Sequence, residues 1–154
     1  MALRDRLAVV DALLARPFPE TTEREGASRE AWEGYRSSGP HHHVCYVMAS
    51  RDFWDDRGEE VVEAAQAEID AALQELATVL TTRWGSPREV DLWPYAEGEA
   101  AAPVPPLDEL GPLTSTMLVW RRPDADRWVA LAVGQADPEF PVLLLAAVGG
   151  TPLD

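Results

Sequence analysis

The chain has 154 residues, enough for one domain with a substantial core, and its formal net charge is −14. A field of this sign repels nucleic acid and anionic membrane surfaces, so both are excluded as partners, whereas a basic protein partner fits. The single cysteine, Cys45, rules out an intramolecular disulfide and fits a reducing compartment. There is no signal-peptide pattern and no apolar run long enough to cross a bilayer, so we expect a cytoplasmic protein.

Amino-acid usage points to the source of the chain. All 13 basic residues are Arg, Lys and Asn are absent, and Ile occurs once. These three amino acids use AT-rich codons, so their scarcity indicates a bacterium with a high-GC genome, of actinobacterial type. The same bias weakens any argument that Arg was selected over Lys for bidentate binding.

The N-terminal stretch predicts one helix followed by a second, shorter one. Apolar residues recur at helical spacing until Pro17 ends the pattern, and the stripe consists of Leu3, Leu7, Val10 and Leu14. A polar connection then runs through Gly26. We expect Ser28 to cap a short helix that carries Trp32 and Tyr35.

Residues His42–Ala49 predict a strand. Val44, Tyr46 and Met48 would face one side of the sheet, and the opposite side would receive His43, Cys45, Val47 and Ala49. Both sides are apolar beyond His43, so we expect this strand inside the sheet rather than at its edge.

A long central helix is predicted over Asp56–Arg83. Asp56 followed by Glu59 is a variant of the capping box, which begins a helix. Gly85 and Pro87 form a stop signal just after it. The apolar face expected to pack on a sheet consists of Val62, Ala65, Ile69, Ala72, Leu73, Leu76 and Leu80.

The remaining elements are strands and one long connection. Arg88–Tyr95 predicts a strand, and Pro94 makes it an edge strand. Residues 96–112 are rich in Ala, Pro and Glu and predict a flexible loop within the domain. Three apolar runs separated by turn residues then predict a C-terminal antiparallel meander: Thr114–Arg121, Arg127–Gly134 and Pro141–Val148.

This order of elements predicts a single α+β domain over residues 1–154. We expect an antiparallel sheet of about five strands, with the long central helix and the N-terminal helix packed on one face. The second face of the sheet is a binding surface by default if nothing covers it.

An acidic cluster lies at the predicted start of the central helix. Residues 50–75 hold nine acids and two Arg, a charge of −7, which is half of the total. Acids at a helix N-terminus interact favourably with the helix dipole, which is one interpretation. The other is a negative patch that docks a basic protein, with exposed Trp side chains as apolar anchors. The candidate partner-binding residues are Asp52, Trp54, Asp55, Asp56, Glu59, Glu60, Glu63 and Trp93.

A histidine run offers an alternative chemistry. In a strand His41 and His43 would share a face, and with Asp52 they would supply three ligands to zinc. Their spacing matches no established metal motif, so a polar start of the strand is the preferred interpretation. Nucleotide-binding and hydrolase motifs are absent as well, and Cys45 in an apolar strand fits a structural thiol. We therefore expect no cofactor.

Three functional hypotheses follow. The first is a non-enzymatic protein-binding module, an adaptor or an acidic immunity or inhibitor protein; in size, acidity and Trp content the chain resembles small immunity proteins that neutralise toxins. The second is a small metal-binding or hydrolytic enzyme that uses His41–His43. The third is a structural subunit that forms a homo-oligomer through the open face of the sheet, so that monomer and homodimer both stay open. We prefer the first hypothesis.

Overall fold

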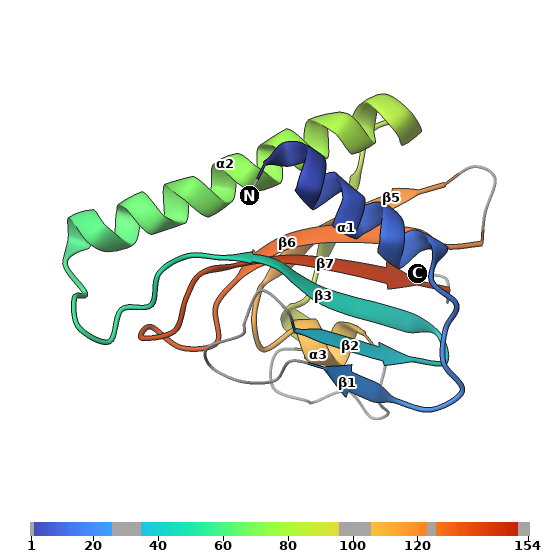
Figure 1. The fold of residues 1–154 in the computed structure, drawn as a ribbon, viewed down its shortest axis with the longest axis horizontal. Coiled ribbons are helices and arrows are strands. Elements are labelled where there is room, and N and C mark those ends of the chain that lie inside the picture. The colour runs from blue at the N-terminus through green and yellow to red at the C-terminus, as the bar shows by residue number, and fades with distance from the viewer. Residues whose placement is uncertain (1, 26–34, 96–105, 123–125, 151–154) are drawn as a thin grey trace.

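The helical patterns and apolar runs form a layered α+β fold in the computed structural model, which describes residues 2–25, 35–95, 106–122 and 126–150 (Figure 1). A seven-stranded antiparallel sheet has the strand order β1-β2-β3-β7-β6-β5-β4. Its strands are β1 (Glu23–Glu25), β2 (Arg36–Gly39), β3 (His42–Ala49), β4 (Arg88–Asp91), β5 (Thr116–Arg121), β6 (Trp128–Gly134) and β7 (Leu143–Gly149). The helices are α1 (Leu3–Ala15), α2 (Glu59–Trp84), the 3-10 turn η2 (Trp93–Tyr95) and the short α3 (Leu107–Leu110).

The five predicted strands are confirmed, and the sheet has two more, β1 and β2, at one edge. The β2 sequence is Arg-Ser-Ser-Gly, which lacks the apolar alternation that identifies a strand. This strand forms through pairing with β3, and the pairing buries Ser37 and Ser38. Tyr35, expected in a short helix, directly precedes β2; Ser28 and Trp32 of that predicted helix lie outside the described residues.

Helices α1 and α2 lie on the same face of the sheet, as predicted (Figure 1). Helix α2 packs on β5, β6 and β7 with almost all of the predicted stripe, and Val62 is only partly buried. Its buried residues are Ala65, Ile69, Ala72, Leu73, Leu76, Ala77 and Leu80. Across the described part of the chain, no helix combines the length and the apolar content that membrane crossing requires.

The two ends of α2 test the predicted boundary signals differently. The predicted capping box at Asp56 was wrong, because α2 begins at Glu59 with Gly58 as its N-cap and without a side-chain cap. Asp56 instead accepts a hydrogen bond from the backbone N–H of Gly58 at 2.8 Å, which closes a turn before the helix. The stop signal is confirmed. Gly85 has a φ of 90°, a conformation that strongly favours glycine and ends the helix.

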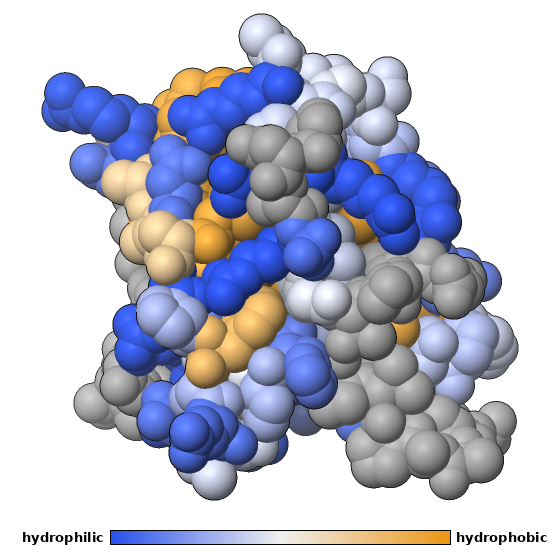
Figure 2. All heavy atoms as spheres, turned by 90° about the vertical axis from the view of Figure 1, so that its right-hand side faces the viewer, coloured by the Kyte–Doolittle hydropathy of each residue, from blue (hydrophilic) through white to orange (hydrophobic). Residues whose placement is uncertain are grey.

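The C-terminal ends of α1 and α2 lie close together. Arg83 Nη1 of α2 lies 2.9 Å from Asp11 Oδ1 of α1, which links the two ends. Both ends lie toward the right-hand side of Figure 1. Figure 2 looks onto this side and shows hydrophilic side chains with apolar surface between them.

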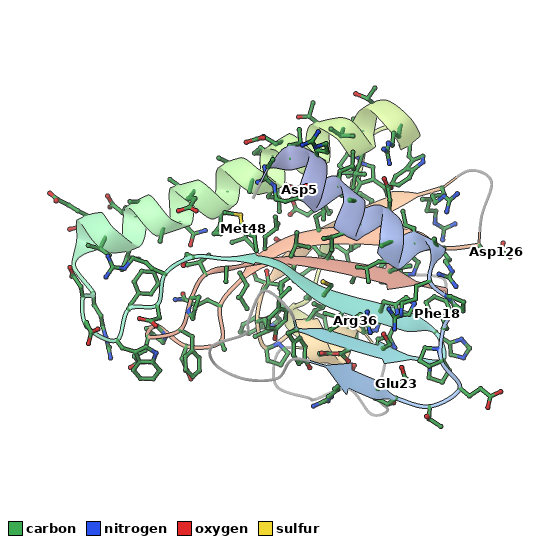
Figure 3. The ribbon with its side chains drawn as sticks, viewed as in Figure 1. Asp5, Phe18, Glu23, Arg36, Met48 and Asp126 are labelled. Atoms are coloured by element: carbon green, nitrogen blue, oxygen red, sulfur yellow. The ribbon has the colours of Figure 1, made fainter. Side chains whose placement is uncertain are left out.

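Strand β3 lies between β2 and β7, so its predicted interior position is confirmed. Its predicted alternation is wrong at the C-terminal end. Pairing with β7 shifts between Tyr46 and Met48, a β-bulge that reverses the facing of the residues after it. Met48 therefore packs with Val47 in the core under the helices, and Ala49 faces the other side. Figure 3 shows Met48 between β3 and α2.

The second face of the sheet is covered where η2 and α3 lie. Leu92, Leu107 and Leu110 are buried against it. The Glu109 carboxylate on α3 accepts hydrogen bonds from Tyr35 Oη at 3.3 Å and from Ser37 Oγ at 3.1 Å, which ties α3 to β2. Within the predicted flexible loop 96–112, Leu107–Leu110 forms α3 and packs on the sheet through Leu107 and Leu110; residues 96–105 lie outside the described part.

Candidate functional site

Two connections and the start of α2 form one end of the molecule. The β3–α2 connection (50–58), the first turns of α2 (59–63) and the β6–β7 connection (135–142) gather at the left-hand side of Figure 1. They do so because β3 and β6 both end at this edge and β7 begins there, as Ala49 and Gly134 each pair with Leu143. We call this region the acidic end.

Backbone and side-chain contacts hold the two connections together. Ser50 N–H donates to the carbonyl oxygen of Val142 at 2.9 Å, and Val142 N–H donates back to Ser50 Oγ at 2.9 Å. Phe53 is fully buried, and its N–H donates to the carbonyl oxygen of Glu139 at 2.9 Å. The β3–α2 connection therefore has a defined conformation although most of its side chains face solvent.

An ion pair between the connections adds orientation more than stability. Arg57 Nη2 lies 2.6 Å from Glu139 Oε1, and both side chains are partly exposed. An exposed pair of this kind contributes at most about 1 kcal/mol. Its effect is to fix the direction of Arg57 and to neutralise one of the few positive charges near the acids.

Trp54 is the apolar feature of the acidic end. Its ring meets the Phe140 ring edge to face at a centroid distance of 5.3 Å, while 41% of the residue stays exposed. Phe140 is itself held, since its N–H donates to Asp137 O at 3.0 Å and its carbonyl accepts from Gln135 Nε2 at 2.8 Å. The indole thus stands on a fixed support and presents apolar area to solvent.

The predicted carboxylates surround this indole in sequence and are all exposed. Eight acids and two Arg occupy residues 51–63 and 135–142, a local charge of −6. The six predicted acids at this end are Asp52, Asp55, Asp56, Glu59, Glu60 and Glu63. The structure therefore brings these acids and Trp54 together, as the cluster in the sequence predicted.

Trp93 is not brought to the same place. It is 73% exposed and begins η2, directly after the edge strand β4, where its N–H donates to Asp91 Oδ1 at 2.9 Å. Both indoles lie toward the same end of the sheet, but β7, β6 and β5 separate β3 from β4. At about 4.8 Å per strand, this separation is roughly 19 Å. Trp93 belongs to a different surface.

The proposed zinc ligands are kept apart. His41 is exposed in the turn before β3, and His43 is fully buried. Asp52 follows the opposite end of β3, whose length is roughly 23 Å. A search of the residues that the structure describes finds no group of three or more His, Cys, Asp and Glu side chains arranged to hold a metal. The prediction that His41, His43 and Asp52 converge was wrong, because it ignored the length of the strand between them.

His43 instead belongs to a buried polar network that sequence reasoning missed. Ser38 Oγ lies 2.6 Å from His43 Nδ1, and His43 Nε2 lies 3.1 Å from the carbonyl oxygen of Arg16. The carbonyl can only accept, so Nε2 carries a proton, and in the neutral imidazole Nδ1 accepts from the serine. Both side chains are at most 2% exposed, so a substrate has no access to this serine and histidine. Their role is structural.

Cys45 also fits the structural interpretation. Burial raises the pKa of its thiol to about 11, against a smaller opposing effect of Arg36. The thiolate, which is the nucleophilic form, is therefore scarce at neutral pH.

Comparison with protein-family models, with curated proteins and with solved structures finds no match. Function is therefore inferred from the acidic end itself. The residues that sequence reasoning missed there are Arg57, Glu139 and Phe140. Their contacts join positions about 80 residues apart, and no local pattern signals them.

Proposed function

We propose that this protein is a non-enzymatic binding module that docks a basic protein partner through its acidic end. The observation that carries the proposal is the position of Trp54: a half-exposed indole on a fixed support, within a run of exposed carboxylates. Acids without an apolar anchor would fit a solvated surface equally well. The indole adds the kind of residue that supplies most of the binding energy at protein interfaces.

The contacts of the acidic end favour binding in two ways. A local charge of −6 accelerates encounter with a positively charged partner and selects against acidic ones. The hydrogen bonds between the two connections also fix the loop before a partner arrives, so less conformational entropy is lost on association. Both effects suit an adaptor or an immunity or inhibitor protein that must capture its target quickly.

We further propose that this binding takes place in the cytoplasm. A single, mostly buried thiol and the absence of a disulfide fit a reducing compartment. The partner would then be a cytoplasmic protein with a Lys- or Arg-rich surface and an apolar recess for Trp54.

The test compares affinity capture from a bacterial lysate by the immobilised protein and by two charge-reversed forms. In the first form Asp55, Asp56 and Glu59 become Lys; in the control form Asp5, Glu20 and Glu89, which are exposed elsewhere, become Lys. We expect a basic protein that is retained by the wild type and by the control form but lost with the first form. Added salt should weaken its retention.

A third form, Trp54→Ala, separates the anchor from the charge. It should weaken retention by about 2 kcal/mol or more, because a central indole is removed, and should leave the salt dependence in place. The proposal fails if no basic protein is retained, or if both charge-reversed forms lose it equally.

A further inference from the structure

The sheet ends in the short edge strand β4, and no further strand lies beside it in the described part of the chain. Leu92 N–H, just after β4, donates to the carbonyl of Ser115 at 2.8 Å. In an antiparallel pair the residues that exchange hydrogen bonds alternate along each strand. Val90 therefore bonds to β5, whereas the N–H and carbonyl groups of Glu89 and Asp91 point away from the sheet.

These outward groups of β4 are open to another strand. Among the described residues, no backbone or side-chain group bonds to the N–H or carbonyl of Glu89 and Asp91. Both residues are exposed. A row of unpaired N–H and carbonyl groups on an edge strand is a template for pairing with a further chain.

Both residues with outward groups are acidic. Side chains alternate along a strand, so Glu89 and Asp91 lie on the face that carries the helices, next to their register partners Leu118 and Thr116 on β5. Asp91 Oδ1 accepts from the N–H of Trp93 at 2.9 Å, a bond to a neutral donor that positions the carboxylate and leaves its charge. The edge thus presents two negative charges at alternate positions.

An exposed indole adjoins the same edge. Trp93 begins η2 two residues after Asp91 and is 73% exposed. An antiparallel strand paired with β4 would continue past this indole and cover apolar area that is now in contact with water. Trp93, which is separate from the acidic end, therefore belongs to the β4 edge.

The charges on β4 select against a second copy of this chain. When two β4 strands pair antiparallel, residues with outward groups must lie opposite one another. The register that pairs both of them places Glu89 of each copy opposite Asp91 of the other, and like charges directly opposite are destabilising. A strand with basic residues at these two positions is attracted instead. Charge complementarity therefore favours a basic segment of another protein.

We propose that the outer edge of β4 binds an extended segment of a partner protein as an added antiparallel strand. The main-chain groups of Glu89 and Asp91 supply the pairing, as in other cases of strand addition. Basic side chains at positions i and i+2 of the segment lie opposite the two carboxylates. An apolar residue two positions before the first basic one contacts Trp93. This surface does not depend on the acidic end.

The test is an NMR titration of the ¹⁵N-labelled protein with the end-capped peptide Leu-Thr-Arg-Val-Arg-Thr. We expect saturable shifts of the Glu89 and Asp91 amides and of the Trp93 indole N–H at peptide concentrations up to about 1 mM. An NOE between the Hα atoms of Val90 and of the peptide Val gives the register, because these residues face each other in a non-hydrogen-bonded pair. The same peptide with Glu in place of both Arg should not bind.

Methylated peptides test the main-chain pairing. In the proposed register the amide of each peptide Arg donates to β4, whereas the amide of the peptide Val points away. N-methylation of the first Arg should therefore raise the Kd about tenfold, since it removes a hydrogen bond and places a methyl group in the interface. N-methylation of the Val is the matched control and should change the Kd by less than about twofold.

Variants of the protein locate the binding. Glu89→Gln should raise the Kd about threefold, the effect of one exposed ion pair. Glu89→Pro also removes an outward N–H, a change that an edge strand tolerates, and should raise the Kd about fivefold further. Trp93→Ala should raise it about tenfold, whereas Trp54→Ala at the acidic end is its control and should not change it. Thermal unfolding of each variant verifies that it is folded.

The proposal is overturned if the peptide gives no saturable shifts, if the Glu-substituted peptide binds as tightly, or if methylation at Arg and at Val has equal effects. Shifts of Glu89 and Asp91 that depend on protein concentration without peptide would also overturn it, because a second copy would then occupy the edge. In the capture experiment, a protein held at β4 is lost with the control form, which carries Glu89→Lys, and kept with the form changed at Asp55, Asp56 and Glu59. Failure at one surface is therefore distinguishable from failure at the other.

Discussion

The side chain of His43 organises the junction between α1 and the sheet. Its ring joins Ser38 on β2 to the backbone of Arg16 just after α1, and it lies 4.9 Å from the Phe18 ring, centroid to centroid. Figure 3 shows Phe18 at this end of the sheet. Burial lowers the pKa of His43 and so favours the neutral imidazole, in which one ring nitrogen donates to the Arg16 carbonyl and the other accepts from Ser38. The residue first considered as a metal ligand is therefore a structural link.

Stability should depend on pH through the two buried histidines. Burial lowers the pKa of His43, and nearby Arg127, Arg16 and Arg36 lower it further, against the hydrogen bond to Arg16; burial also lowers that of His42, against Glu109 and Asp108. As the pH falls, these histidines bind protons in the unfolded chain at a higher pH than in the folded chain. The free energy of unfolding is therefore highest above about pH 6.5 and decreases as the pH falls toward the native pKa. The slope reaches about 1.4 kcal/mol per pH unit for each histidine.

Urea unfolding between pH 5 and 8 measures this slope, and His43→Gln should reduce it. His41→Gln removes an exposed imidazole from the adjacent turn and controls for the substitution itself. An NMR titration gives an independent reading: a native His43 pKa above 6.5 would contradict the expectation.

A glycine beside Trp128 sets how closely β6 and β7 pack. Gly149 pairs with Trp128, and a Cβ on Gly149 would overlap the indole, which is buried on the second face. Gly149→Ala must displace this ring, at a cost of about 1–3 kcal/mol in the free energy of unfolding. Chemical denaturation measures the loss. Gly58→Ala is the control, because its nearest contact is the tip of the exposed Asp56 side chain, and a loss as large as that at Gly149 would refute the packing argument.

Among the elements, α1 is anchored at its C-terminal end by Arg127. Its C-terminal carbonyls at Leu14 and Arg16 accept from Arg127, which precedes β6 and stacks 3.9 Å from the Phe18 ring centroid. Arg127→Met keeps the aliphatic stem and removes these contacts, so the free energy of unfolding should fall by about 2 kcal/mol.

Hydrogen exchange distinguishes local from global loss in this variant. The amides of α1, Leu13 and Leu14 among them, should exchange faster relative to those of β7, because the helix end has lost its anchor. Arg121→Met, an exposed position on β5, should change stability by less than about 0.5 kcal/mol. Equal effects of the two substitutions would rule out the anchoring role.

The elements that were predicted well from the sequence have a local apolar pattern of their own. Helix α2 has helical apolar spacing and a local stop at Gly85, and β5–β7 are short apolar runs between turn residues. The elements that it missed depend on partners instead: β2 on pairing with β3, and the 106–112 segment on the second face of the sheet. The bulge that turns Met48 toward the helices is likewise a property of pairing, so no pattern within β3 announces it.

The features of the acidic end also fall into those that the sequence predicts and those that depend on long-range pairing. Its carboxylates and Trp54 are neighbours in sequence, so their clustering could be predicted from the sequence. The support of Trp54 by Phe140, and the position of Trp93 beyond three intervening strands, depend on the sheet order. Pairing of β3 with β7, nearly a hundred residues later in the chain, is a long-range choice that local spacing does not encode.

In the whole molecule, negative charge gathers at one end of the strands. The acidic end carries −6, against a formal net charge of −14 for the whole chain. Like charges this close repel one another and destabilise the folded state, so a chain selected for stability alone would dilute them. The crowding of acids at one end thus argues for a function that uses the charge.

Removing the charge while keeping the hydrogen bonds tests this argument. Asp56 accepts from Gly58 N–H, and asparagine retains that acceptor. We expect the triple variant Asp52→Asn, Asp55→Asn, Asp56→Asn to be more stable than the wild type by about 0.5–1 kcal/mol at low salt, because repulsion is relieved. The difference should shrink at about 0.5 M NaCl, where the Debye length is only a few ångströms.

Asp11→Asn is the opposite control: it weakens the pair with Arg83 at 2.9 Å and should lower stability slightly. Urea unfolding at both salt concentrations decides between the two interpretations: a triple variant less stable than the wild type at low salt would mean that the acids serve the fold rather than a partner.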